Sequence, residues 1–335
     1  MKKALLIFFL FPFIGMAQQN FNFMHDGMSR EYIYYSPVNL APDAPLVFVA
    51  HGYTGSAQGI MGYSGMNALA DQNGFAVCYP QGTMDSQNNR FWNVGYDFTA
   101  NSTIDDVDFI TSLASYLQTT HNLSTANTFF TGMSNGGELA YLLACQASDS
   151  FRAYAPVAGT MFPNGLNNNV CNPSIAVPIF ETHGLNDNIT LYEGDANDTF
   201  WGPYLGMDTI ISFWTSQNML SDLVIDTFPN LNNPNKITIS YKYSSPNSNN
   251  QVWLYTHRSG HNWGDDGDMV IQNEIWDFFE IHLTANATSI YDQNKFQKKQ
   301  IGYYDVFGRK VKHSNNTVLF QLFEDGSVEK KIMIE

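Results

Sequence analysis

The chain has 335 residues, of which 44% are hydrophobic and 15% aromatic, a composition that excludes a disordered chain and is sufficient for a large folded core. Its 31 acidic and 16 basic residues give a formal net charge of −15 at pH 7. Because such a surface repels phosphate groups, this charge argues against nucleic acid and anionic membrane surfaces as partners, and we predict no nucleic-acid binding.

The first 17 residues have the pattern of a secretory signal peptide. Two lysines precede an apolar run over residues 4–14, and small residues follow at positions 15 and 17. We therefore predict that residues 1–17 are removed and that the mature chain begins at Gln18. The apolar run is too short for a stable membrane-spanning helix, and the sequence shows no other long one. The sequence thus predicts an exported protein, secreted or at the cell surface, with no transmembrane segment in the mature chain.

Strand-like and helix-like segments alternate after the signal, which favours an α/β fold with a mostly parallel central sheet flanked by helices. Short apolar runs are typical of strands covered on both faces, and apolar residues spaced by three and four predict helices. Residues 192–250 are rich in Asn, Gly, Pro and aromatic residues. Apart from one helix near residues 207–219, this region is interpreted as insertions over the carboxyl edge of the sheet. The predicted strands are 30–38, 45–50, 75–79, 127–131, 152–157, 176–181 and 252–256, and the predicted helices are 105–120, 138–144, 207–219 and 268–282.

The composition changes near residue 285, where lysines become common and short alternating segments are separated by turns. This change predicts two domains, a catalytic domain over 18–285 and a small β module over 286–335.

Three cysteines are present in a chain predicted to be exported, so a disulfide is permitted. Cys145 and Cys171 flank predicted core elements and could pair, whereas Cys78 lies in a strand-like run and is interpreted as a buried free thiol. The chain has no C-x-x-C motif, and residues 265–268 (DDGD) lack the full spacing of a calcium loop. We therefore predict no metal and no cofactor.

Ser134 lies in the motif GMSNGG over residues 132–137, which has the form G-x-S-x-G. A strand-like run precedes this motif and a helical pattern follows it, as a nucleophile elbow requires. Small flanking residues allow the strand and the helix to approach closely around a strained serine. The motif therefore predicts that Ser134 is the nucleophile of a hydrolase.

A serine nucleophile needs a base and an acid that orients this base. His261, in a loop between the last predicted strand and the last predicted helix, is the predicted base, with His257 as the nearest alternative. Asp187 follows a strand between Ser134 and His261 and is the predicted acid, with Asp195 and Asp198 as alternatives. His183 is interpreted as a residue that shapes the turn before Asp187.

The developing oxyanion needs hydrogen-bond donors, which the backbone after the nucleophile and the loop after an earlier strand supply in this architecture. We predict the N–H groups of Asn135 and Tyr53 in this role, with Thr54 as the alternative to Tyr53. The remaining candidates are aromatic and amide side chains in loops that could bind a sugar ring or a phenolic acid, or could simply pack. The predicted substrate-binding residues are Trp92, Asn93, Trp201 and Trp263.

Taken as a set, several segments resemble the extracellular polyhydroxybutyrate depolymerase / feruloyl esterase family. The resemblance covers about residues 30–283, and it implies an α/β-hydrolase fold with the triad Ser134, Asp187 and His261. The chain departs from the family at residues 189–192, where Val-Pro-Tyr is frequent, and at Gly264, where many relatives have proline. The matching segments are PLVFVAHGYTGS, CYPQG, FWN, IDDVDFI, TGMSNGGELAYLLAC, FRAYAPVAGT, VPIFETHGLNDNITLYEG and SGHNW.

The tail resembles a C-terminal sorting domain of the Bacteroidetes type IX secretion system through its segments YDVFGRK and DGSVEKKIMIE. This resemblance implies translocation by that machinery, removal of the tail, and release or surface attachment.

The sequence thus predicts a secreted serine carboxylic ester hydrolase that acts through an acyl-enzyme. Its expected substrates are polymer-linked or oligomeric esters, namely feruloyl or acetyl esters of polysaccharide or a polyhydroxybutyrate-type polyester. A non-catalytic surface glycan-binding protein on a hydrolase scaffold and a serine peptidase are the alternatives.

Overall fold

The structure is a computed structural model that describes residues 19–163, 171–229, 237–264, 269–284, 300–304, 309–311, 318–323 and 328–332. The chain divides into two compact units, one up to Thr284 and one from Ala285 onward. The predicted signal peptide over residues 1–17 and the DDGD segment over 265–268 lie outside the described residues.

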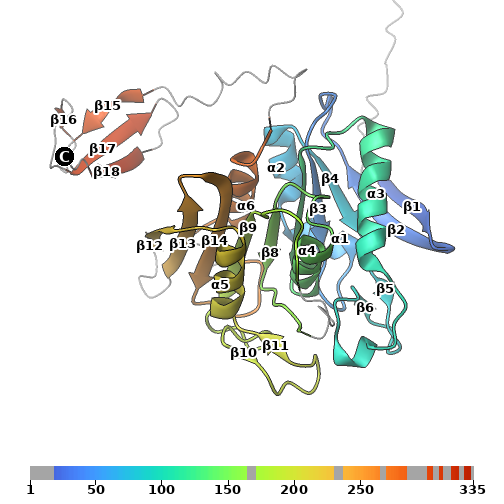
Figure 1. Cartoon of the computed structure of the whole chain (residues 1–335). Coiled ribbons are helices and arrows are strands. Elements are labelled where there is room, and N and C mark those ends of the chain that lie inside the picture. Colours follow the sequence, from blue (N-terminus) through green and yellow to red (C-terminus); the bar gives the residue numbers. More distant parts are fainter. Residues whose placement is uncertain are drawn as a thin grey trace, which may run out of the picture. The chain divides into compact units, whose positions relative to one another are not determined.

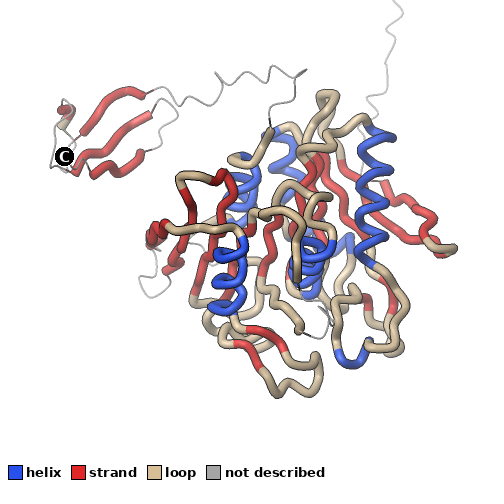
Figure 2. Tube along the Cα trace, viewed as in Figure 1, coloured by secondary structure: helices blue, strands red, loops and turns tan. Residues whose placement is uncertain are grey.

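A ten-stranded sheet forms the centre of the first unit (Figures 1 and 2). Its six middle strands run parallel to one another, whereas the two outer strands at each edge pair antiparallel. In spatial order the strands are β1 (Gln19–His25), β2 (Met28–Tyr35), β4 (Ala76–Pro80), β3 (Leu46–Ala50), β7 (Thr128–Met133), β8 (Tyr154–Val157), β9 (Ile179–Gly184), β14 (Ser248–His257), β13 (Ile237–Ser245) and β12 (Asp222–Pro229).

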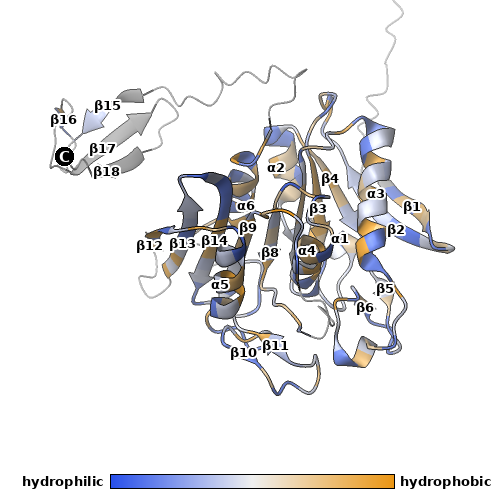
Figure 3. Ribbon diagram, in the orientation of Figure 1, coloured by the Kyte–Doolittle hydropathy of each residue, from blue (hydrophilic) through white to orange (hydrophobic). Residues whose placement is uncertain are grey.

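Helices cover both faces of this sheet, as strand β3 illustrates. Leu46 and Phe48 pack in one core cluster with residues of three helices (Asp106–His121, Asn135–Gln146 and Met207–Gln217), whereas Val47 and Val49 pack in a second cluster with residues of the other three. Because neighbouring side chains of a strand point to opposite faces, a continuously apolar strand requires this double cover. Figure 3 shows hydrophobic residues concentrated in the central strands. The helices are α1 (Ala57–Tyr63), α2 (Met66–Asn73), α3 (Asp106–His121), α4 (Asn135–Gln146), α5 (Met207–Gln217) and α6 (Ile271–Glu280).

The connections between these strands and helices also contain two short hairpins and one turn of 3-10 helix. They are β5 (Thr83–Met84) with β6 (Arg90–Phe91), β10 (Gly194–Asp195) with β11 (Tyr204–Leu205), and η1 (Asp97–Thr99).

The structure corrects the interpretation of residues 192–250 as loops with a single helix. This region also contains β12 and β13, which extend the sheet as an antiparallel ribbon beyond β14. Their side chains are mostly partly or fully exposed, so they lack the apolar runs that mark the central strands. The strand β1 and the helices α1 and α2 also have no counterpart among the predicted elements.

A disulfide joins Cys145, at the end of α4, to Cys171, with the two Cα atoms 4.5 Å apart. Cys78 in β4 is buried and free, as predicted. Within the residues that the structure describes, no helix has the length and hydrophobicity needed to cross a membrane.

The second unit contains a four-stranded antiparallel sheet. Its strands, in spatial order, are β16 (Lys310–Val311), β15 (Gln300–Tyr304), β17 (Val318–Phe323) and β18 (Val328–Ile332).

Candidate active site

Ser134 forms a strained turn between β7 and α4. Its backbone has φ 55° and ψ −122°, a conformation that residues other than glycine rarely adopt and that clusters at functional sites. Glycines at 132 and 136 allow α4 to pack closely against β7 and β3. A Cβ at Gly136 would lie 2.2 Å from the Ala50 carbonyl oxygen, and one at Gly132 would lie 2.5 Å from the Gly136 carbonyl oxygen. The Ser134 N–H donates to the Val157 carbonyl at 2.8 Å, which ties the turn to the neighbouring strand β8.

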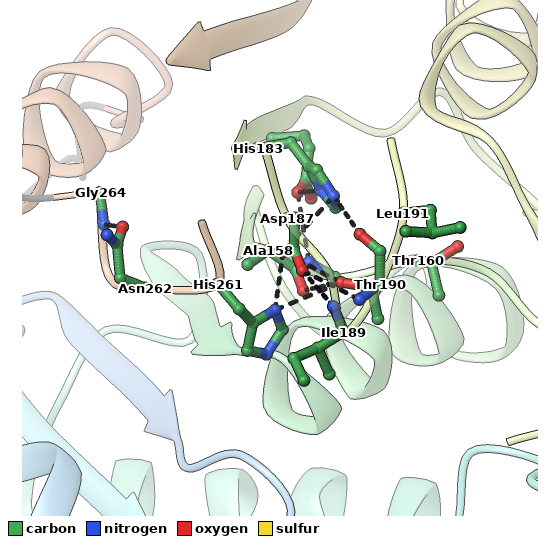
Figure 4. Close-up of polar contacts among 12 residues, drawn as sticks. Ala158, Thr160, His183, Asp187, Ile189, Thr190, Leu191, His261, Asn262 and Gly264 are labelled. Atoms are coloured by element: carbon green, nitrogen blue, oxygen red, sulfur yellow. Dashed lines mark hydrogen bonds and ion pairs between the residues drawn. The ribbon is translucent and has the colours of Figure 1, made fainter. Parts of the chain in front are cut away.

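Asp187 and His261 meet at the same edge of the sheet. Asp187 follows β9 and His261 follows β14, and these strands are parallel neighbours, so the loops at their carboxyl ends lie side by side. The His261 Nδ1 and Asp187 Oδ2 atoms are 2.7 Å apart (Figure 4). The Asp187 side chain is fully buried, whereas that of His261 is 15% exposed. His261, rather than the alternative His257, is therefore the histidine that this carboxylate orients.

The carboxylate of Asp187 is held in its ionised form by several donors. The N–H groups of Ile189 and Thr190 donate to Oδ1 at 2.8 and 3.0 Å. The Thr190 hydroxyl, which has one proton, lies 3.3 Å from Oδ2 and shares this proton between Asp187 and the Ala158 carbonyl. Burial alone would raise the pKa of Asp187, but the bond from His261 and these backbone donors bring the pKa below its usual value. The alternatives Asp195 and Asp198 instead accept backbone N–H groups within their own loop.

Hydrogen bonds connect the serine turn to the acid through β8. The Ala158 N–H donates to the Thr182 carbonyl at 2.8 Å, and the Ala158 carbonyl accepts the Thr190 hydroxyl at 3.2 Å. Among the described residues, no hydrogen bond joins the Ser134 hydroxyl directly to His261. In unliganded hydrolases this contact is often loose and tightens only when substrate binds.

Two loops offer backbone donors beside Ser134. Asn135 is the first residue of α4, so its N–H has no acceptor within the helix. Gly52 lies against the serine, because a Cβ at Gly52 would be 3.2 Å from the Ser134 Cβ, and Tyr53 follows it. The N–H of Thr54, the alternative donor, is already bonded to the Arg90 carbonyl at 2.8 Å. This geometry favours Tyr53 over Thr54.

His51 fixes the loop that carries Tyr53. The Gly82 N–H donates to His51 Nε2 at 3.0 Å, so Nδ1 carries the proton and donates to the Gly52 carbonyl at 2.7 Å. Burial of the ring lowers the pKa of His51 to about 4, which keeps the imidazole neutral and this pattern of donor and acceptor fixed at neutral pH.

The four predicted substrate-binding residues differ in their exposure and in their contacts. Trp92 is fully buried, and its indole N–H donates to the His51 carbonyl at 2.9 Å, which argues against direct contact with a substrate. Trp263 is only 6% exposed and packs edge-on against Tyr63. The Asn93 side chain donates to the Ile104 carbonyl at 2.8 Å. Only Trp201 keeps a partly exposed ring among these three tryptophans.

An aromatic cluster that the sequence does not reveal surrounds Trp201. Its ring centroid lies 5.3 Å from that of Tyr53 and 4.6 Å from that of Phe200, and the Phe200 side chain is 51% exposed. Tyr96 and Phe98 complete the cluster. Through Tyr53 this cluster adjoins the Gly52 backbone that packs on Ser134, so we define it as the aromatic cluster of the candidate site.

Two buried acids near the site have no counterpart among the residues predicted from the sequence. Burial raises the pKa of Glu138, in the first turn of α4, to about 8, and that of Glu181, on β9, to about 7. The signal that could have found them is an acidic residue inside an otherwise apolar segment, as in GGELAYLLA and VPIFET.

A surface cavity of about 570 Å³ lies beside the loop over residues 93–107 and is also lined by Leu142 and Gln146 of α4. None of Ser134, Asp187 and His261 lines it. This cavity is therefore distinct from the place where Ser134, Asp187 and His261 lie.

A hydroxyl on a strained turn, an imidazole bonded to a buried carboxylate and backbone N–H groups beside the hydroxyl are the set that acyl transfer requires. Solved structures confirm the α/β-hydrolase fold. An acetyl xylan esterase from Aspergillus awamori matches with a TM-score of 0.56 at 17% identity, covering 79% of this chain and 99% of that one. The Bacillus cereus carboxylesterase matches with a TM-score of 0.51 at 11% identity, covering 76% and 95%. At these identities the likeness shows the fold alone.

The sequence identifies the family. Residues 30–208, just over half of the chain, match the model described as esterase PHB depolymerase, and the chain belongs to this family.

Curated relatives carry esterase names. A bifunctional acetylxylan esterase/xylanase of Neocallimastix patriciarum is 29% identical over 175 residues, which are 50% of this chain and 23% of that protein. A probable acetylxylan esterase A of Aspergillus clavatus is 27% identical over 215 residues, 57% of this chain and 68% of that protein. Feruloyl esterase B of Piromyces equi is 25% identical over 178 residues, 52% of this chain and 32% of that protein. The chain thus spans less than half the length of two of these three relatives.

Proposed function

We propose that this protein is a serine carboxylic ester hydrolase with Ser134 as nucleophile, His261 as general base and Asp187 as the acid that orients His261. The observation that carries the proposal is the 2.7 Å contact between His261 Nδ1 and Asp187 Oδ2 at the sheet edge where Ser134 forms its strained turn. Family membership supports the same chemistry.

The reaction proceeds in two halves. His261 accepts the Ser134 proton as the hydroxyl attacks the ester carbonyl, and the backbone N–H groups of Asn135 and Tyr53 stabilise the oxyanion. His261 then protonates the leaving alcohol, which leaves an acyl group on Ser134. Water activated by the same imidazole releases the acid and restores the serine.

The proposed substrates are polymer-linked or oligomeric esters. Relatives named acetylxylan esterase and feruloyl esterase favour acetyl or feruloyl groups on polysaccharide, and the family description favours a polyhydroxybutyrate-type polyester. The aromatic cluster supports a ring-bearing substrate, because Trp201 and Phe200 offer partly exposed faces for stacking on a sugar or a phenolic acid.

The assay that tests this proposal compares the wild type with Ser134→Ala on p-nitrophenyl acetate, p-nitrophenyl butyrate, methyl ferulate and a 3-hydroxybutyrate oligomer. We expect hydrolysis that is lost in the variant, and the preferred acyl group distinguishes the substrate classes. Equal rates for both proteins, or none for either, would reject the triad for these esters. A matched amide panel and a glycan-binding assay then test the peptidase and binding alternatives.

We further propose that residues 1–17 are a signal peptide and that residues 286–335 direct export through a type IX secretion machinery. The four-stranded sheet within this tail and the sequence resemblance support the second assignment. The mass of the protein recovered from the medium of an expressing host tests both parts. We expect a chain that begins at Gln18 and lacks the tail, and a secreted chain that retains residues 1–17 contradicts the first assignment.

A further inference from the structure

Behind Asp187 lies a buried pair of titratable side chains that the proposed reaction does not use. Glu181 and His183 both lie on β9 and are two residues apart, so they share a face of the strand, and neither side chain is exposed to solvent. The His183 Nδ1 and Glu181 Oε1 atoms are 3.1 Å apart, and His183 Nε2 lies 2.8 Å from the Thr190 carbonyl oxygen. Figure 4 shows Asp187 between His183 and His261.

The partners determine where the protons of this pair lie. A carbonyl oxygen only accepts, so His183 Nε2 must carry a proton and donate it to Thr190. The contact between Nδ1 and Glu181 needs one further proton, carried by either atom. Burial disfavours the imidazolium, but the Glu181 carboxylate raises the pKa of His183 above its usual value. At neutral pH the pair therefore holds one shared proton, and its net charge is zero.

Thr190 connects this pair to the acid. Its N–H and hydroxyl donate to Asp187, while its carbonyl accepts the proton of His183, so the residue is held from both sides. The His183 Nε2 and Asp187 Oδ2 atoms are 3.7 Å apart, which makes the imidazole a neighbour of the carboxylate without replacing its bond to His261. A shift of Thr190 would displace its N–H, which donates to Asp187 Oδ1, and its hydroxyl, which Asp187 shares with the Ala158 carbonyl.

We propose that His183, anchored by Glu181, is a positioning residue that holds Thr190 and thereby keeps Asp187 aligned with His261. The inference rests on the proposed function, because it assigns His183 a role behind the proposed acid. His183 itself does not touch the reacting atoms. Its contribution is the orientation of the carboxylate, for which a displacement of about 1 Å can lower turnover by about 100-fold.

Two amide variants separate the two bonds of the imidazole. In His183→Gln the side-chain amide extends to the position of Nε2, so the donor to Thr190 is kept and the bond to Glu181 is lost. In His183→Asn the amide lies near the position of Nδ1, so the bond to Glu181 is kept and the donor to Thr190 is lost. Both variants remove one buried hydrogen bond and are expected to lose similar stability, on the order of 1–3 kcal/mol.

The proposal predicts that these variants differ in turnover although their stabilities are similar. We expect His183→Asn to lower kcat for p-nitrophenyl acetate by about 10- to 100-fold with KM changed by less than about twofold, and His183→Gln to lower kcat by no more than about threefold. Melting temperatures and circular dichroism verify folding. Equal losses of kcat in both variants, or an unchanged kcat in His183→Asn, would overturn the proposal.

A measurement without substrate separates this proposal from the proposed function. The proton on His261 Nδ1, bonded to a buried carboxylate, is expected to give a far-downfield proton resonance in the wild type. This resonance should remain in His183→Gln and weaken or move upfield in His183→Asn. If wild type and Ser134→Ala hydrolyse no ester, the proposed function fails, and the resonance alone still decides the positioning role: an identical signal in both His183 variants rejects it.

Discussion

Glu138 makes the stability of the protein depend on pH in a way that one substitution should remove. It is 3% exposed in the first turn of α4, where the Tyr96 hydroxyl and the Asn135 side-chain amide donate to its Oε2. Burial, with added repulsion from Glu181 and Asp187, raises the pKa of Glu138 from 4.5 to about 8. The folded protein therefore keeps this carboxyl protonated over a pH range in which the unfolded chain ionises it.

The sign and the size of the effect follow from this difference. Between pH 4.5 and 8 the folded state binds more protons than the unfolded state, so the free energy of unfolding falls as the pH rises. At about 1.4 kcal/mol for each pKa unit, the full effect has an upper limit of roughly 5 kcal/mol. Of this, about 3 kcal/mol falls between pH 5.5 and 8.5.

Urea unfolding of the wild type and of Glu138→Gln at pH 5.5, 7.0 and 8.5 measures this term. The amide is neutral throughout, so we expect the wild type to lose about 3 kcal/mol relative to the variant between pH 5.5 and pH 8.5. The difference between the proteins removes the contribution of the titrating groups that do not interact with Glu138. A difference that stays constant across this range would refute the assigned pKa and the reasoning from burial.

Three further outcomes are expected. Asp187→Asn should lower kcat on p-nitrophenyl acetate by about 10⁴-fold, because the amide no longer holds the required tautomer of His261; a loss below about tenfold would contradict the role of Asp187. Replacing Cys145 and Cys171 by serine opens a loop with a sequence separation of 26 residues and should lower the free energy of unfolding in urea by about 3.5 kcal/mol, a prediction that an unchanged transition midpoint would reject. Trp201→Ala should raise KM for methyl ferulate by about 2- to 10-fold, and an unchanged KM would exclude stacking on this ring.

Local sequence patterns predicted the elements that position the site. The G-x-S-x-G motif lies between a β-prone run and a helical pattern, and the structure has β7, Ser134 and α4 in this order. These patterns involve residues that are close in the sequence, so they can be recognised without knowing which distant residues pack against them. Asp187 and His261 were each predicted to follow a strand, and the structure shows that these two strands, β9 and β14, are parallel neighbours whose loops bring the acid and the base into contact.

Features that depend on distant partners could not be predicted in the same way. Trp92 lies in a loop by sequence, but its burial depends on His51 and Asn135, which come from two other strand ends. The raised pKa of Glu138 depends on how deeply α4 is buried and on the nearby charges of Glu181 and Asp187, which are distant in the sequence. The strands β12 and β13 were missed because their side chains are mostly partly or fully exposed, so they lack the continuous apolar runs on which the strand predictions relied.

The most direct test of the central claim is covalent labelling of the nucleophile. An alkyl fluorophosphonate reacts with an activated serine hydroxyl, with the oxygen displacing fluoride from phosphorus. We expect one phosphonyl group per wild-type chain by intact mass, mapped to the peptide containing Ser134, and none on Ser134→Ala. Labelling of another residue, or equal labelling of both proteins, would contradict the assignment of Ser134 as the activated nucleophile.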